Sequence, residues 1–99
     1  MSASFAIPLS GMNAARTRLA VSAQNIASVY AEDDRRREVA LESLRDGGVE
    51  ATIVPAREPG PALVDDVIGQ LIARNQFLAN LALFRGNYYR IGSLLDIAV

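Results

Sequence analysis

Apolar and small residues recur through the first third of the chain at alternating spacings of three and four positions. This spacing places them on one face of a helix, in the heptad-like pattern of a coiled coil. Pro8 suits a first helical turn, and residues 1–7 are expected to form a frayed end. The pattern therefore predicts a helix over residues 9–29. Its apolar face consists of Met12, Ala15, Leu19, Ser22, Ile26 and Val29, and its other face carries Asn13, Arg16, Gln24 and Asn25.

The last third, residues 62–97, predicts a second helix with apolar residues on more than one face. Such a helix must be covered on more than one face. Asp65 and Asp66 lie in its first turns, where carboxylates favour the positive end of the helix dipole. We expect the first helix to cover one apolar stripe and to leave the other for further contacts. One stripe consists of Val64, Val67, Leu71, Leu78, Leu81, Tyr88 and Leu95, interrupted by Arg74, Arg85 and Gly92, and the second of Ile68, Ile72, Ala79, Leu83, Ile91 and Leu94.

Residues 37–54, between these helices, alternate between apolar and polar positions, as strands do. The sequence Asp46-Gly47-Gly48 separates two alternating runs and is typical of a hairpin turn. These features favour a β-hairpin, although Glu38–Arg45 is also compatible with an amphipathic helix. The Pro-rich stretch 55–61 then predicts a linker.

Residues 31–37 include three consecutive acidic residues followed by three arginines. We interpret this run as a solvated connection, with an electrostatic contact to a neighbouring subunit as the alternative. Together the patterns predict one domain over residues 1–99 of a mainly α class. Two long antiparallel terminal helices form a coiled-coil-like hairpin, and a small β-hairpin lies between them in sequence.

Composition narrows the possible functions. The chain has 99 residues, a formal net charge of −1, and no cysteine or histidine. The near-neutral charge argues against binding to nucleic acid or to an anionic membrane surface. The missing histidine removes the commonest general base and metal ligand, so we expect no enzymatic activity, cofactor or metal site. No segment has the pattern of a cleaved signal peptide or of a membrane-spanning helix.

The stretch Ser10–Leu19, followed by Asn25-Ile26-Ala27, resembles the N-terminal segment of the bacterial flagellar axial proteins. That family, which includes rod and hook components, has a small-Gly-apolar start, then a leucine, and then Asn-Ile-Ala-Asn. Ser28 replaces the second asparagine of the family pattern. Val29-Tyr30-Ala31 replaces the Thr-Pro-Gly-Tyr type sequence that often follows.

The C-terminal segment resembles the same family independently. Val64–Ile68 is similar to the family's Val-Glu-Glu-apolar-Val, and Phe77–Asn80 stands in place of Tyr-Glu-Ala-Asn. Leu94–Ile97 is similar to the closing apolar motif. Two terminal motifs in the right order, on either side of a variable middle, make the resemblance stronger than either motif alone.

Finer similarities point to the proximal rod. Arg35–Val39 and Gly48–Ala51 are most similar to the rod protein C group, whereas Phe84–Tyr89 is closer to the rod protein B group. The middle segment of these proteins, rich in Pro and Asp, is shortened here to residues 55–61.

The resemblance implies a structural subunit of the flagellar basal-body rod, the drive shaft that crosses the periplasm. Its partners would be other rod subunits and further copies of itself, joined through the terminal helices. The family is exported by the flagellar type III export apparatus without cleavage of a signal peptide. The rival interpretation, from a different class, is a soluble helical-hairpin adaptor that binds one regulatory or export partner.

The expected functional residues form a subunit interface rather than a reactive site. Asn25 and Asn80 recur in the family, and a buried asparagine can set the register of paired helices. Simple solvent exposure of both is the alternative. The full set of expected interface residues is Leu9, Gly11, Met12, Leu19, Asn25, Ile26, Val64, Val67, Leu71, Leu78, Asn80, Leu81, Tyr88, Leu94, Leu95 and Ile97.

Overall fold

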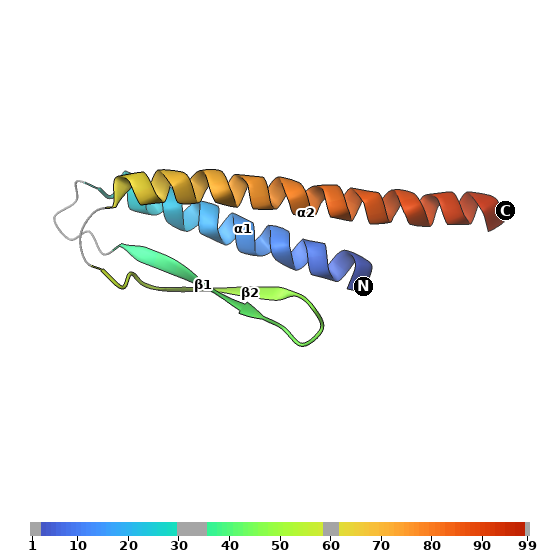
Figure 1. Cartoon of the computed structure of the whole chain (residues 1–99), viewed down its shortest axis with the longest axis horizontal. Helices are drawn as coiled ribbons and strands as arrows, with labels where there is room; N and C mark the ends of the chain where they lie inside the picture. The colour runs from blue at the N-terminus through green and yellow to red at the C-terminus, as the bar shows by residue number, and fades with distance from the viewer. Residues whose placement is uncertain (1–2, 30–35, 59–61, 99) are drawn as a thin grey trace.

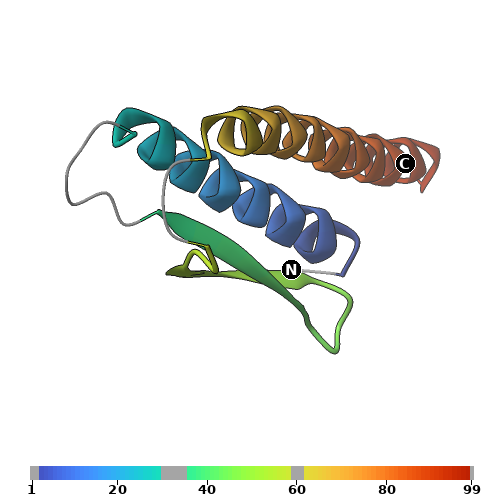
Figure 2. The ribbon, with the colours of Figure 1, turned by 60° about the vertical axis from the view of Figure 1, so that its left-hand side comes forward.

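The computed structural model describes residues 3–29, 36–58 and 62–98. The chain begins with helix α1 (Ala3–Ala27) and ends with helix α2 (Leu63–Ala98). Between them in sequence lies an antiparallel hairpin of β1 (Arg37–Ser43) and β2 (Val49–Pro55). The predicted mainly helical fold with a small β-hairpin between two helices is thereby confirmed. In space α1 is the middle layer, with α2 on one side and the hairpin on the other (Figures 1 and 2).

Helix α1 begins earlier than the sequence pattern predicted. It starts by Ala3 rather than near Leu9, so the expected frayed end is largely helical. Phe5 packs against Phe84 of α2, with ring centroids 5.1 Å apart in an edge-on arrangement. This contact provides a tertiary reason for the added turns. Pro8 consequently lies inside the helix, where it removes one backbone hydrogen bond, and its ring is buried.

Small side chains line the contact between α1 and α2. A Cβ atom added to Gly11 of α1 would lie 2.5 Å from Oδ1 of Asn80 on α2. Farther along the contact, a Cβ atom added to Gly69 would lie 3.3 Å from Oγ of Ser22. Ala73, on the α2 face between these positions, is completely buried. The two helices therefore approach each other through glycine, alanine and short polar side chains.

The expectation that α1 covers one of the two apolar stripes of α2 is wrong. The face of α2 that meets α1 carries Asp66, Gly69, Ala73 and Asn80 instead. At about 100° per residue, this face lies between the two stripes on the helix surface. Both stripes consequently flank the contact. Every Leu, Ile and Val of α2 whose burial the structure describes, except the half-buried Leu81, is exposed.

The β-hairpin packs on the side of α1 opposite α2. Its strands pair Val39 with Ile53 and Leu41 with Ala51, residues whose side chains share one face of the hairpin. Leu41 borders a cavity of about 230 Å³ that α1 also lines. Gly47 adopts a positive φ of 92° in the turn, a conformation that glycine reaches without a steric cost.

Ser10 joins the hairpin to α1. Its hydroxyl donates to the Ile7 carbonyl at 2.7 Å and accepts the backbone N–H of Val49 at 3.1 Å. Because the turn of the hairpin lies directly over this hydroxyl, a Cβ atom on Gly48 would come within 2.9 Å of it. One side chain thus satisfies a backbone donor at the start of β2 and positions the turn.

Helix α2 continues beyond the end of α1. Phe84 meets Phe5 close to the first turn of α1, and α2 runs on to Ala98 (Figure 1). Cβ atoms added to Gly86 and Gly92 would meet no atom of another described element within 4 Å. The C-terminal part of α2 therefore has no neighbour among the described residues that restricts these two positions.

The close approach at Gly11 predicts an unusual response to Gly→Ala substitution. In an open helix interior this change stabilises by about 1 kcal/mol. Gly11→Ala should instead destabilise the fold by about 1–3 kcal/mol, because the new methyl group overlaps the side chain of Asn80. Thermal or urea unfolding followed by circular dichroism measures the difference.

Gly86→Ala is the matched control for this experiment. No described residue beyond its own helix backbone and chain neighbours comes within 4 Å of its added Cβ atom, so it should stabilise the protein by about 0.5–1 kcal/mol. The double variant with Asn80→Ala should recover most of the loss caused by Gly11→Ala. Equal stabilisation by both Gly→Ala changes would show that the Asn80 side chain does not restrict the position of Gly11.

Candidate functional site

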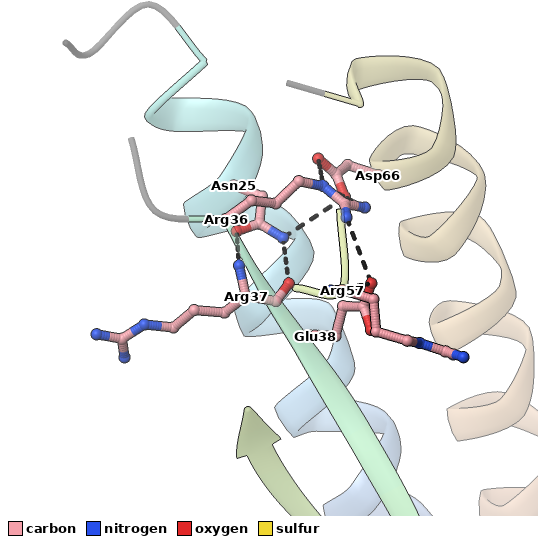
Figure 3. Close-up of polar contacts among 6 residues, drawn as sticks. All are labelled: Asn25, Arg36, Arg37, Glu38, Arg57 and Asp66. Atoms are coloured by element: carbon pink, nitrogen blue, oxygen red, sulfur yellow. Dashed lines mark hydrogen bonds and ion pairs between the residues drawn. The ribbon is translucent and has the colours of Figure 1, made fainter. Parts of the chain in front are cut away.

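A buried polar cluster joins the C-terminal end of α1, the start of β1 and the first turns of α2 (Figure 3). It consists of Asn25 of α1, Arg36 just before β1, and Asp66 of α2. Asn25 is 6% exposed, Asp66 is 5% exposed and the Arg36 side chain is 14% exposed. Polar side chains at this depth destabilise a fold unless they are hydrogen-bonded to one another.

Asn25 binds the backbone at the start of β1. Its side-chain nitrogen donates to the Arg37 carbonyl at 2.8 Å, and its side-chain oxygen accepts the Arg37 N–H at 3.1 Å. The amide thereby imitates a neighbouring strand for one residue. The same nitrogen lies 3.5 Å from Oδ1 of Asp66. Asn25 is therefore buried and hydrogen-bonded, and its main partner is the hairpin rather than another helix.

Arg36 and Asp66 form the ion pair of this cluster. The Arg36 Nε donates to Oδ1 and Oδ2 of Asp66 at 3.1 and 3.2 Å, and Nη2 donates to Oδ1 at 2.5 Å. This hydrogen bonding raises the pKa of the Arg36 guanidinium, and it outweighs the opposing effect of burial. Both groups are charged at neutral pH, so the pair satisfies two charges that would otherwise be buried alone.

Two weaker ion pairs extend the cluster toward solvent. Arg36 Nη1 lies 3.7 Å from Oε1 of Glu38, and Arg57 Nε lies 3.6 Å from Oε2 of the same carboxylate. The Arg57 side chain is 92% exposed, so water and salt screen this second contact. The stabilising part of the network is consequently the buried pair between Arg36 and Asp66.

The arrangement does not bring together the groups of a reactive centre. A cavity of about 240 Å³ borders the cluster, and Asp65 and Asp66 both line it. The two carboxylates are consecutive on a helix and point in different directions, and the second is already bound by arginine. In the described parts of the chain, no three potential metal-ligating side chains come together. The geometry is suited to holding the end of α1, the start of β1 and the first turns of α2 in fixed relative positions.

The structure divides the expected interface residues into an inner and an outer group. Within the chain, Gly11 contacts Asn80, and Met12 and Asn25 are buried, while Leu9, Ile26 and Leu81 are half-buried. The side chain of Ile97 lies outside the described residues. The exposed members are Leu19, Val64, Val67, Leu71, Leu78, Tyr88, Leu94 and Leu95.

Apart from Leu19 of α1, the outer group forms part of a larger apolar surface on α2. Val64, Leu71, Leu94 and Leu95 are each more than half exposed, with fractions between 57% and 71%. The two adjacent tyrosines, Tyr88 and Tyr89, are 65% and 70% exposed and contact each other edge-on. Many exposed large apolar side chains on one helix are typical of an interaction site.

Sequence reasoning missed two structural contacts. Arg36 belongs to a run interpreted as a solvated connection or an intersubunit contact, but it binds Asp66 within the chain; residues 31–35 of that run lie outside the described part. For Asp66 the sequence predicted only a favourable interaction with the helix dipole. Ser10, expected near the start of a helix, instead lies inside α1 and binds the hairpin. An isolated sequence offers no spacing rule that pairs residues so far apart.

The described part of the chain contains no helix both long enough and apolar enough to cross a membrane. No family model matches the sequence, and no curated protein matches it.

The buried ion pair leads to a stability prediction. Asp66→Asn should lower the free energy of unfolding by about 2–3 kcal/mol, because it removes the hydrogen-bonded carboxylate and leaves Arg36 with only its longer contact to Glu38. The pair requires a protonated Arg36, whose pKa is raised in the folded state. The guanidinium's contribution is therefore present through the neutral range and is lost as pH rises through that alkaline pKa.

Asp65→Asn is the control, since it removes the same charge from an exposed neighbour. Its effect on stability should stay within about 0.5 kcal/mol. Urea unfolding of the two variants at pH 7 measures both values. Equal losses would show that helix N-terminal charge, rather than the ion pair, is what Asp66 contributes.

Proposed function

We propose that the chain is a structural subunit of the bacterial flagellar basal-body rod, which polymerises through its terminal helices. The observation that carries the proposal is the exposed apolar surface of α2. A subunit that transmits torque needs many distributed contacts with its neighbours, and the two stripes on α2 offer such contacts along a helix of 36 residues. The similarity of both terminal segments to flagellar axial proteins supplies the identity of the assembly.

The free end of α2 supports an intersubunit role. Leu94 and Leu95 are 65% and 61% exposed and lie in the segment that continues past α1. This segment includes the closing apolar motif that resembles the rod family. Burial of a Leu side chain contributes about 2 kcal/mol, so each neighbour that covers this end stabilises the assembly.

The proposal includes a coiled-coil-like pairing of α1 with α2. Contacts between the helices occur at α1 positions separated by three, four or seven residues, as in a heptad pattern. The Arg18 Nη1 donates to Oε1 of Gln76 at 2.6 Å as one of these contacts. The contacting residues are Gly11, Arg18, Ser22 and Asn25 on α1, and Asn80, Gln76, Gly69 and Asp66 on α2.

The proposed location and partners follow from the same assignment. The chain would reach the periplasm-spanning rod through the flagellar type III export apparatus, without a cleaved signal peptide. Its neighbours there would be other rod subunits and copies of itself. No catalytic activity, cofactor, nucleic-acid binding or membrane insertion belongs to this role.

Removal of residues 94–99 tests the function in cells. The truncated chain should keep the contact between α1 and α2, because Phe84 and the residues before it remain, but it should lose flagellar assembly and swimming motility. Motility in soft agar and fractionation with purified basal bodies are the measurements. Truncated protein that supports normal motility and assembly would contradict the assignment of the C-terminal end to an interface.

Sedimentation of the purified full chain separates the rod subunit from the adaptor. A rod subunit should form concentration-dependent polymers or co-assemble with rod components, because its apolar stripes remain uncovered in a monomer. A discrete one-to-one complex with a regulatory or export protein, without further growth, would favour the adaptor instead.

A further inference from the structure

We propose that the β-hairpin of one copy binds helix α2 of a second copy, so that subunits stack head to tail. The hairpin contributes the outer face that carries Glu42 and Glu50, and α2 contributes the stripe that carries Arg74 and Arg85. This proposal rests on the proposed self-assembly and names the surfaces that carry it. The two surfaces lie on opposite sides of the molecule, because α1 separates the hairpin from α2 (Figures 1 and 2). A contact between unlike surfaces can repeat from copy to copy and generate an open assembly.

The hairpin surface carries an uncompensated pair of like charges. Glu42 and Glu50 are directly paired across the two strands, and both are exposed. Like charges at opposed strand positions destabilise a hairpin. Among the described residues neither carboxylate forms an ion pair, and the nearby Arg36 and Arg57 bind Glu38 and Asp66 instead. A guanidinium placed between Glu42 and Glu50 would remove the repulsion.

The stripe on α2 carries the matching cations. Arg74 and Arg85 interrupt its apolar residues and are separated by about three helical turns, or about 16 Å, so they lie on the same face. Both are exposed, and neither forms an ion pair with a described residue. Leu78 lies between them on this stripe and is 45% exposed. The segment of the stripe from Arg74 to Arg85 is therefore apolar at its centre and positive at both ends.

The two surfaces also match in length and shape. Glu38 and Glu42 lie on the same face of β1, about 13 Å apart. Midway along β1 between Glu38 and Glu42, the exposed pair Ala40 and Thr52 has small side chains, which leave room for a leucine. One arginine would lie between Glu42 and Glu50, and the other would reach the level of Glu38. Leu78 would cover the small pair between them.

Reversal of the charges tests this contact. The variant E42R/E50R keeps a like-charge pair in the hairpin, so its fold should be unaffected, but its hairpin would repel the arginines of the next copy. The variant R74E/R85E creates the reciprocal repulsion. Each should raise the concentration for half-maximal self-association by about tenfold or more in analytical ultracentrifugation. Far-UV circular dichroism verifies that each variant is folded.

Restoration of the contact is the decisive measurement. The quadruple variant E42R/E50R/R74E/R85E has the wild-type net charge of −1 and should associate as the wild type does. An equimolar mixture of the two double variants should also associate, because each unlike pair of surfaces is again complementary. The control R16E/R90E changes the net charge as R74E/R85E does, at exposed residues that lie off the hairpin and off the stripe with Arg74 and Arg85, and should associate normally.

Three results would overturn the proposal. Wild-type association that neither double variant weakens would place the contact elsewhere, and weakened association that the quadruple variant fails to restore would reject this pairing. A wild-type chain that stays monomeric at all concentrations would show that the occupant is not a second copy. The rod assignment is judged separately, because fractionation with basal bodies reports it even when the isolated chain does not self-associate.

Discussion

The close packing of α1 against α2 is the constraint on which the rest of the molecule depends. Glycine, alanine and serine on the facing surfaces allow the two helices to approach, and Asn80 occupies the space above Gly11. Dispersion contacts of this kind are individually weak but accumulate along the seam. The small side chains also bury little apolar area. The helix pair therefore depends on additional interactions at its ends for a single, well-defined register.

Those interactions lie at the two ends of α1. At its N-terminal end Phe5 meets Phe84, and at its C-terminal end Asn25 and Asp66 bind the segment that begins β1. Since Arg36 and Arg37 supply the hairpin side of this cluster, the same few groups position all three layers. A hairpin of two strands is marginally stable alone in water, and its attachment to α1 through Ser10 and Asn25 compensates for this weakness.

Use of the small-residue face for the internal contact leaves the large apolar residues outside. The leucines, isoleucines and valines of α2 flank the seam and are exposed on both sides of it. In a monomer such surface favours aggregation, whereas in an assembly it provides the contact area. The same arrangement explains why a chain of 99 residues carries a helix of 36 residues. The proposed subunit achieves part of its burial only among its neighbours.

Local pattern by itself determined the element types and their order. Period-two alternation on either side of Asp46-Gly47-Gly48 predicted the hairpin, and recurrent apolar spacing predicted both helices, because these signals act over a few residues. Tertiary structure decided that α1 begins by Ala3 and that Arg36 binds Asp66. It also decided that small residues, rather than leucines, line the contact between α1 and α2. Periodicity reports which faces of a helix are apolar. Which face is buried depends on how closely another backbone can approach, and that depends on the shapes of both surfaces together.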